Sequence, residues 1–482
     1  MSTITRNNVA KSLFWKLLER IGVQLCSFVV LIVLARLLTP TEYGTIAIVN
    51  ILLSVAAALI QGGMNTALIQ KKEIDELTIN TVFYASTAVF VVFYIVLYST
   101  SGFFASFFNQ PILEQIIPII ALTLIVGAVN SIQLALLSRQ MKFKQIFYCS
   151  LIPAIISGTV GIILANLGWG VWALVAQQAT LHLTQMICMF IATHWFPSLR
   201  FSFKKLKEIW GFSINIMLSN LLTSIFLEIR SLVIGKFYTA AELSYFEKGR
   251  YLPQIIMTNI NSSILSVIFP VFSSMQDDIG KIKQYLRRCI KTSSYVTFPI
   301  MTLLAVAAEP IIVFLLTEKW IEAVPFVQVF ALTYMIMPVH QSNIEVIKAL
   351  GKGEIILKLD ILRKIVELTT LLIALRYGPL AIAIGAFIAS IISIFINLNP
   401  NRKLIDYSYS EQFKDILPTT LITMAMGMAV YPIHNLEFSP LITILIVFTV
   451  GSIVYILLSK IFKIESFEYA VQLISNRRKN NI

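Results

Sequence analysis

The sequence is short of charge, and this shortage limits the kind of protein that it can encode. Only 13% of its 482 residues are charged and 57% are hydrophobic, whereas a soluble globular chain carries about 25% charged residues. A chain with so few charges cannot cover a water-facing surface, so most of it must face lipid. The sequence therefore predicts a polytopic membrane protein and excludes a soluble enzyme.

The sequence also lacks the motifs of common ATPases, hydrolases and redox proteins. It has no GxxxxGK[ST] phosphate loop, no GxSxG elbow, no HExxH and no CxxC. Its four cysteines and four histidines are scattered, without zinc spacing or a disulfide framework. We therefore expect no metal site, no cofactor and no ATP hydrolysis by this chain, and we expect structural roles for the histidines.

Long apolar runs are what the sequence has in abundance. A transmembrane helix needs about 20 mostly apolar residues, and a transmembrane β-strand needs about ten residues of alternating polarity. The runs here exceed a strand in length and do not alternate, so we predict an all-α polytopic membrane protein. About 14 transmembrane helices are expected, over residues 12–38, 42–69, 79–100, 112–137, 146–167, 170–193, 210–235, 251–273, 293–317, 323–347, 355–376, 379–398, 415–433 and 440–461.

The basic residues predict the orientation of these helices. If the N-terminus is cytoplasmic and the chain changes side at each helix, 28 of the 38 Lys and Arg residues fall in cytoplasmic segments or the helix ends next to them, and five fall in or next to external segments. Cytoplasmic loops of membrane proteins carry such an excess of positive charge. Both termini are therefore predicted to be cytoplasmic, and the net charge of +13 needs no nucleic-acid partner.

A short motif occurs twice in the chain. Residues 34–44 read LARLLTPTEYG and residues 234–244 read IGKFYTAAELS, with a basic residue, a threonine and a glutamate at matching positions. Each copy ends one long helix at the external face and precedes another. In the first copy, Thr41 is expected to be the N-cap of the second helix. The duplication indicates two parallel repeats of six helices.

The repeat predicts how the chain divides. We expect an N-lobe of helices 1–6 over residues 1–194, a basic cytoplasmic linker over residues 195–209, and a C-lobe of helices 7–12 over residues 210–398. Residues 399–482 would hold two extra helices and a basic cytoplasmic tail.

Polar side chains inside the predicted helices are candidate functional residues, because ionisable groups are costly in lipid and tend to face an internal cavity. In helices 1, 2, 7 and 8 they gather on one side of the helix. Either these sides line one cavity between the lobes, or they are interfacial anchors and interhelical hydrogen bonds. The candidates are Lys16, Glu19, Arg20 and Gln24 of helix 1, Asn50, Gln61 and Asn65 of helix 2, Asn220 and Glu228 of helix 7, and Asn261 of helix 8.

The helix predicted over residues 355–376 carries the sharpest charged stripe. Asp360, Arg363, Lys364 and Glu367 share one face, at spacings of three and four residues. We expect Asp360 to pair with Lys364, and Arg363 with Glu367. Glu367 would lie about 18 Å into the membrane, near its middle. The stripe serves either transport or the joining of helices.

Several of these features together resemble a known family. The run LARLLTPTEYGTIAIVN at residues 34–50, the basic start of the first helix and the plan of six, six and two helices resemble the Wzx-type polysaccharide flippases. The R-x-L-T-P-x-E-Y-G part is most similar to the WzxC-like branch of lipopolysaccharide and exopolysaccharide exporters. The resemblance covers essentially the whole chain, and it places the chain in the superfamily of MATE exporters and lipid II flippases.

The resemblance implies a transporter, not an enzyme, in the bacterial cytoplasmic membrane. Such flippases move an oligosaccharide repeat unit, linked by diphosphate to undecaprenol, to the outer leaflet by alternating access, for O-antigen, capsule or exopolysaccharide synthesis. Membrane lipids, a polysaccharide polymerase and glycosyltransferases are the implied partners. Carried onto this sequence, the resemblance implies diphosphate binding by Lys16, Arg20, Arg363 and Lys364. It also implies coupling to an H⁺ or Na⁺ gradient through Glu19, Glu228, Asp360 and Glu367, within a cavity lined by the polar residues named above.

Other function classes make different predictions. A MATE-like small-molecule exporter would need a cavity dominated by acids, whereas this chain mixes both signs and is basic near the cytoplasmic side. A membrane polysaccharide polymerase or ligase typically carries a large external catalytic loop, and the longest external segment here is about 15 residues, 236–250. A structural scaffold would not need a charged stripe at mid-membrane.

Overall fold

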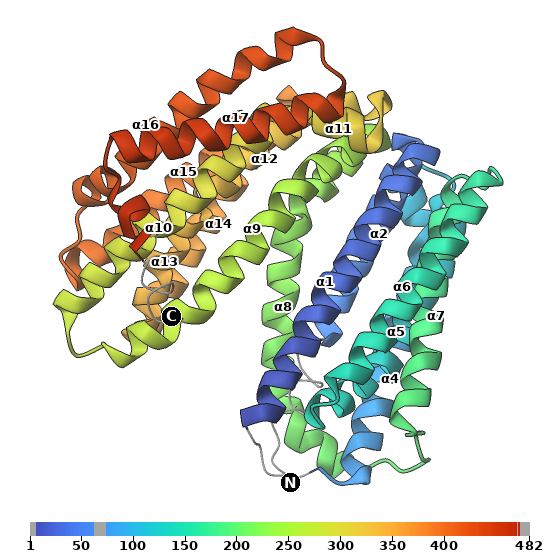
Figure 1. Cartoon of the computed structure of the whole chain (residues 1–482). Coiled ribbons are helices and arrows are strands. Elements are labelled where there is room, and N and C mark those ends of the chain that lie inside the picture. Colours follow the sequence, from blue (N-terminus) through green and yellow to red (C-terminus); the bar gives the residue numbers. More distant parts are fainter. Residues whose placement is uncertain (1–5, 62–73, 470, 473–482) are drawn as a thin grey trace. The chain divides into compact units, whose positions relative to one another are not determined.

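Helices make up nearly all of the chain that the structure describes (Figure 1). The structure is a computed structural model, and it describes residues 6–61, 74–469 and 471–472, in which no strand occurs. The first half contains α1 (Arg6–Leu37), α2 (Pro40–Gln61), α4 (Glu76–Phe107), α5 (Leu113–Arg139), α6 (Phe143–Asn166), α7 (Val171–Thr193) and α8 (Phe203–Phe237). The second half contains α9 (Ala240–Ser274), α10 (Ile279–Val306), α11 (Ala308–Leu316), η1 (Glu318–Ala323), α12 (Val324–Met335), α13 (Met337–Ala349), α14 (Gly353–Ala374), η2 (Leu375–Tyr377), α15 (Pro379–Leu404), α16 (Tyr409–Val430), η3 (Tyr431–Leu436) and α17 (Pro440–Ile461).

Over the described residues, each of the predicted transmembrane segments coincides with a helix or with two consecutive helices; residues 62–69 of the segment 42–69 lie outside the described part. Among the described residues, 13 stretches are helical, long and apolar enough to cross a membrane. The remaining predicted segment, 355–376, corresponds to α14, which carries the charged stripe and therefore has more charged residues than a typical membrane span. The predicted fold class, an all-α polytopic membrane protein, is confirmed.

Two segments that the sequence predicts as single helices are interrupted. α10 ends at Val306 and α11 begins at Ala308, while α12 ends at Met335 and α13 begins at Met337. A proline, Pro310 or Pro338, lies in the first turn of each second helix. Proline has no N–H to donate, and its ring clashes with the carbonyl four residues earlier, so the preceding helix cannot continue unchanged.

The two copies of the repeated motif build the same helix start. The Thr39 N–H donates to the Glu42 carboxylate at 2.7 Å, and the Glu42 N–H donates to the Thr39 hydroxyl at 3.4 Å. Thr239 and Glu242 repeat this exchange at 2.9 and 3.2 Å. Both are capping boxes, in which threonine is the N-cap and glutamate the third helical residue. The prediction of Thr41 as the N-cap was wrong, because the T-x-x-E spacing sets the helix start one residue after Thr39.

The chain divides into two compact units, Met1–Ser244 and Tyr245–Ile482. In the first unit, α1 packs on α6, α6 on α7, α4 on α5, and α2 on α8. Close approach of α1 and α6 depends on Gly158, since a Cβ there would lie 2.3 Å from Cγ2 of Val30. Membrane helices commonly use small residues in this way to bring their backbones together.

The division between the units falls later in the chain than the linker over 195–209. α8 follows that linker but packs on α2 and α4, so it belongs to the first unit. The lobes predicted over 1–194 and 210–398 were defined by the sequence repeat and not by packing. Their boundaries therefore stay a prediction.

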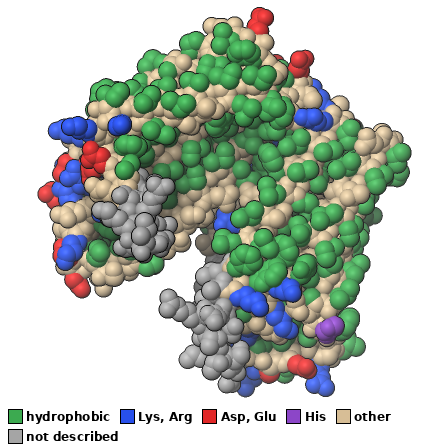
Figure 2. Space-filling model, viewed as in Figure 1, with side chains coloured by type: hydrophobic (Ala, Val, Ile, Leu, Met, Phe, Trp, Pro, Cys, Tyr) green, Lys and Arg blue, Asp and Glu red, His purple; other side chains and the backbone are tan. Residues whose placement is uncertain are grey.

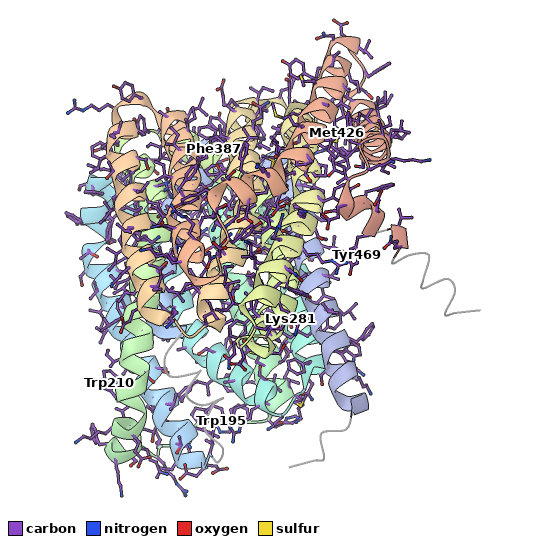
Figure 3. All side chains as sticks on the ribbon, turned by 90° about the vertical axis from the view of Figure 1, so that its left-hand side faces the viewer. Trp195, Trp210, Lys281, Phe387, Met426 and Tyr469 are labelled. Atoms are coloured by element: carbon purple, nitrogen blue, oxygen red, sulfur yellow. The ribbon has the colours of Figure 1, made fainter. Side chains whose placement is uncertain are left out.

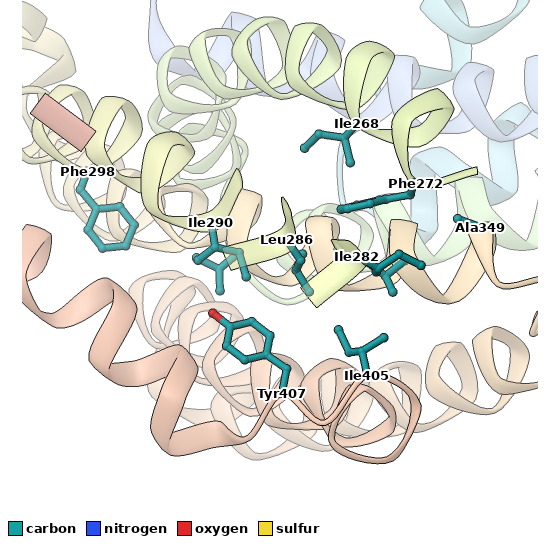
Figure 4. Packing of buried hydrophobic residues seen from close by; sticks show 11 residues of the cluster. Ile268, Phe272, Ile282, Leu286, Ile290, Phe298, Ala349, Ile405 and Tyr407 are labelled. Carbon is teal, nitrogen blue, oxygen red and sulfur yellow. The ribbon is translucent and has the colours of Figure 1, made fainter. Parts of the chain in front are cut away.

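The second unit is built around α10. Ile282, Leu286 and Ile290 recur every four residues along α10 and form a buried stripe against Phe272 and Tyr407 (Figure 4). α10 also packs on α12, α13 and α16, and α14 packs on α15. The charged residues of α10 are therefore on its other faces, away from this core.

The surface agrees with a membrane environment. On the face shown in Figure 2, hydrophobic side chains cover the sides of the helices, and most charged side chains gather near helix ends. Large apolar residues such as Leu372 and Ile373 are 68% and 64% exposed. Exposed apolar area of this extent needs lipid to cover it, so the chain is a multi-pass membrane protein.

Candidate functional site

The charged stripe of α14 is partly buried. Arg363 is 20% exposed, Glu367 28%, Lys364 34% and Asp360 50%. Arg363 lies about 15 Å along the helix from Gly353, which is near the middle of a membrane span. A cation at this depth requires a partner or a hydrated environment.

The stripe forms two ion pairs, and they differ from the predicted ones. Arg363 pairs with Asp360, and the Lys364 ammonium lies 3.0 Å from the Glu367 carboxylate. Both pairs join residues three apart, whereas the sequence analysis expected pairs four apart. Side chains at either spacing are neighbours on a helix, so the predicted face was right while the pairing within it was wrong.

The interruption between α12 and α13 places two further polar residues next to this stripe. His340 follows Pro338 in the first turns of α13 and lies within electrostatic range of Arg363. The adjacent Gln341 accepts a hydrogen bond from Asn261 of α9. In the second unit, α9, α13 and α14 thus bring candidate residues Asn261 and Arg363 close to His340 and Gln341, which the sequence analysis did not assign to the site.

The candidates on α1 contact the cytoplasmic start of α6. The Ser150 hydroxyl donates to Glu19 at 3.5 Å, and the Lys16 ammonium lies 5.5 Å from the centre of the Phe143 ring. Arg20 is exposed and Gln24 is half-buried on the same helix. Lys16 and Glu19 therefore help to hold α1 against α6, whereas Arg20 presents its charge away from the protein interior.

Part of the polar side of α2 serves helix packing. Asn50 accepts a hydrogen bond of 3.0 Å from Gln178 of α7, and the Ser224 hydroxyl of α8 donates to the Ser54 carbonyl at 3.3 Å. Interhelical hydrogen bonds of this kind join membrane helices. For Asn50 and Ser54, the structure therefore favours the second of the two explanations that the sequence left open.

The interhelical contacts described above do not involve the remaining candidates. Asn220 and Glu228 are half-buried on α8. Asn65 and the side chain of Gln61 lie outside the described residues. The assignment of all these residues to a transport cavity stays a prediction.

A buried acid near the start of α16 forms a cluster that the sequence analysis did not find. Asp415 is 4% exposed and accepts two hydrogen bonds from Arg287, at 2.7 and 2.8 Å. The Lys291 ammonium lies 3.3 Å away, and the Tyr407 hydroxyl donates to Asp415 at 2.7 Å. Burial and the hydrogen bond to Asp415 raise the pKa of Tyr407 far above its ordinary value, so Tyr407 remains a neutral donor. This cluster joins α10 to α16.

Comparison with known proteins shows which family this chain belongs to. A family model described as "Polysaccharide biosynthesis protein" matches residues 33–325. The chain belongs to this family. The match includes both capping boxes, at Thr39 and at Thr239, and it continues to the start of α12.

Two curated relatives cover most of the chain. The succinoglycan biosynthesis transport protein ExoT of Rhizobium meliloti (strain 1021) is 23% identical over 73% of this chain and 72% of its own length. The lipopolysaccharide biosynthesis protein WzxC of Escherichia coli (strain K12) is 20% identical over 82% of each chain. The resemblance to the WzxC-like exporters is thereby confirmed.

A solved structure shares the fold. The lipid II flippase MurJ, in an inward closed conformation, superposes with a TM-score of 0.73 at 16% identity and covers 94% of this chain and 98% of its own. This polysaccharide biosynthesis family protein therefore has a transporter fold. It is a multi-pass protein of the cytoplasmic membrane.

Proposed function

We propose that this protein moves lipid-linked oligosaccharide repeat units from the cytoplasmic to the outer leaflet for surface polysaccharide synthesis. The observation that carries the proposal is the polysaccharide biosynthesis family match on a chain of which 94% shares the fold of the MurJ flippase. The finer identity of the substrate, an undecaprenyl diphosphate carrying the sugar, follows from the resemblance to Wzx-type flippases. A charged head and a lipid tail need a polar path beside an apolar surface, and α14 offers both.

The charged stripe of α14 is the proposed contact for the diphosphate. Arg363 pairs with Asp360 and Lys364 with Glu367, and Arg363 retains a buried Nε–H without a partner among the described residues. A diphosphate offers several acceptor oxygens, and guanidinium groups bind phosphates with two parallel hydrogen bonds. Substrate binding would therefore exchange the intrahelical pairs for pairs with the diphosphate. In the first unit, we propose that the exposed Arg20 of α1 contacts the diphosphate, together with Lys16 one turn earlier.

Release of the carboxylates provides a route to ion coupling. When the diphosphate takes Arg363 and Lys364, the carboxylates of Asp360 and Glu367 lose their cations and become more costly inside the membrane. Binding of H⁺ or Na⁺ at these groups would offset that cost. Glu19 and Glu228 are the corresponding candidates in the first unit. No other cofactor is part of the proposal, and the polymerase and glycosyltransferases of the same process are its proposed partners.

The direct test is the leaflet orientation of a fluorescent undecaprenyl-diphosphate oligosaccharide in proteoliposomes. Wild-type protein would be compared with Arg363→Gln, and with Arg376→Gln as the matched control, because Arg376 is an exposed cation just beyond the external end of α14. Loss of one charge-assisted hydrogen bond costs about 1.5–3 kcal/mol, or about 10- to 150-fold in rate. We expect this slowing for Arg363→Gln and wild-type movement for Arg376→Gln.

A small-molecule exporter of the same fold is the alternative function. It would transport an organic cation down or against an ion gradient, and it would leave the lipid-linked oligosaccharide in its original leaflet. Equal movement by Arg363→Gln and wild type would leave the function standing, but it would remove Arg363 from the substrate path.

A further inference from the structure

The second unit contains a basic cavity that the proposed transport does not use. It has a volume of about 600 Å³ and lies between the first turns of α10 and the residues that follow α17. Lys281 and Tyr469, labelled in Figure 3, belong to these two segments. Small-molecule sites in proteins commonly have volumes of about 300–1,000 Å³. The lining includes Lys281, Tyr285, Arg287, Arg288, Lys291 and Glu465.

The cations of this cavity exceed the acids that neutralise them. Arg287 and Lys291 are joined to Asp415, and Lys291 also lies 2.6 Å from the Glu465 carboxylate. Four basic side chains line the cavity, and three acids pair with them: Asp278 with Lys281, Asp415 behind the cavity and Glu465 in its wall. One positive charge is thus left over, and a cleft with such an excess attracts an anion.

The guanidinium of Arg288 is oriented by an aromatic ring. Its guanidinium carbon lies 3.8 Å from the centre of the Tyr469 ring. Stacking on an aromatic face immobilises the guanidinium but leaves the N–H groups at its edge available for hydrogen bonds. Among the described residues, Arg288 forms no ion pair. Its planar group is therefore preorganised for a phosphate oxygen.

The packing of α10 explains only part of these charges. The hydrophobic core of the unit takes the opposite face of the helix through Ile282, Leu286 and Ile290. Lys281 is 68% exposed and pairs with Asp278 only one turn away. Arg287 and Lys291 join α10 to α16 through Asp415, whereas the described contacts of Lys281 and Arg288 do not fix α10 against another transmembrane helix.

The position of the cavity indicates the source of the anion. In the predicted orientation, the start of α10 and the residues after α17 lie at the cytoplasmic surface, where both helices leave the membrane. Ile279, at the first turn of α10, is 51% exposed and gives the neighbourhood an apolar edge. Basic pockets between transmembrane helices on the cytoplasmic side are suited to anionic lipid head groups.

We propose that this cavity binds the phosphate of an anionic phospholipid of the cytoplasmic leaflet. Arg288 supplies paired hydrogen bonds, Lys281 and Lys291 supply charge, and Glu465 opposes binding. The site is separate from the stripe on α14, and its occupancy is independent of whether the protein transports a lipid-linked sugar. A free phosphate or diphosphate has the same chemistry at its oxygens, so the test must separate the two sources.

The test measures binding of fluorescent phosphatidylglycerol to the full-length protein, purified in detergent and stripped of lipid. Phosphatidylcholine, a zwitterionic lipid without net charge, serves as the comparison, and inorganic pyrophosphate serves as the soluble competitor. Removing one cation near a lipid surface is worth about a fivefold change in affinity. We expect Arg288→Gln to weaken phosphatidylglycerol binding about fivefold and Glu465→Gln to tighten it by a similar factor. Lys358→Gln is the matched control, since Lys358 is an exposed cation of α14 that does not line the cavity.

Opposite effects of Arg288→Gln and Glu465→Gln, with no competition by pyrophosphate, would support the lipid site. Competition by pyrophosphate that Arg288→Gln abolishes would assign the cavity to a soluble phosphate and overturn the lipid source. Equal affinity for phosphatidylglycerol in wild type, Arg288→Gln and Glu465→Gln would overturn the site itself. If Arg288→Gln does not fold, Arg288→Lys keeps the charge without the paired hydrogen bonds, and Glu465→Gln still tests the sign of the effect.

Discussion

The contact between the two copies of the repeated motif leads to a sharp prediction at Gly44. This glycine lies in the second turn of α2, where a Cβ would be only 1.7 Å from the backbone carbonyl oxygen of Ala240, at the start of α9. In proteins, the distance from a Cβ atom to a heavy atom of a neighbouring segment is essentially never under 3.0 Å. Gly44→Ala therefore forces the two helix starts apart by more than 1 Å, because backbone on both sides cannot rotate away.

The expected cost follows from overpacking. Inserting a methyl group into a packed site destabilises proteins by about 1–3 kcal/mol, while replacing glycine by alanine inside a helix stabilises it by about 1 kcal/mol. The clash exceeds the gain in helix propensity, so Gly44→Ala should lower the thermal midpoint of the purified protein in detergent. Gly127→Ala on α5 is the matched control, since a Cβ there meets nothing within 4 Å.

The assay is thermal unfolding followed by tryptophan fluorescence and by size-exclusion recovery after heating. The contact between the helix starts predicts a lower midpoint for Gly44→Ala and an equal or higher one for Gly127→Ala. Midpoints that coincide for Gly44→Ala and wild type would refute the close approach of Gly44 and Ala240. A lower midpoint in both variants would show that the cost comes from glycine replacement as such.

Three further predictions concern stability and use the same unfolding assay. Thr239→Ala removes the N-cap of α9 and should cost about 1 kcal/mol, whereas Thr239→Ser should retain most of the stability; equal losses in both would contradict the capping box. Asp415→Asn leaves Arg287 without its buried carboxylate and should destabilise the protein by about 3–5 kcal/mol, and the exposed Asp277→Asn should not; a neutral Asp415→Asn would remove the cluster from the stabilising contacts. The Thr78 hydrogen bonds lower the pKa of Asp75, the N-cap of α4, so its contribution is complete above the ordinary aspartate pKa of about 3.9 and disappears as the pH falls through its lowered value. Asp75→Ser should therefore make stability less sensitive to acid below about pH 5, and an unchanged pH profile would contradict that role.

Helix positions were predictable because membrane spans leave a strong signal in composition. The interruptions at Ala307 and Ile336 were not, although Pro310 and Pro338 are visible in the sequence. Other prolines, such as Pro118 and Pro153, lie inside uninterrupted helices of the same structure. In membranes, neighbouring helices can satisfy the carbonyl that a proline leaves free, so packing decides which proline ends a helix.

The candidate site was predictable as a face but not as a set of contacts. Helical periodicity placed Arg363 and Glu367 on one side of α14, yet it could not choose between partners three and four residues away. The contact of Arg287 with Asp415 joins residues far apart in sequence, and no local pattern encodes such a pair. The capping box at Thr39 was different, since its T-x-x-E spacing is a local signal that can be recognised without a structure.

Movement of the lipid-linked oligosaccharide between leaflets is the measurement that tests the central claim most directly. Vesicles containing wild-type protein would be compared with protein-free vesicles for the rate at which an undecaprenyl-diphosphate oligosaccharide becomes accessible on the opposite face. The same vesicles would be tested in parallel with an organic cation. A flippase predicts protein-dependent movement of the lipid-linked sugar and no transport of the cation. Transport of the cation alone, with the sugar remaining in its original leaflet under imposed H⁺ and Na⁺ gradients, would contradict the proposed function.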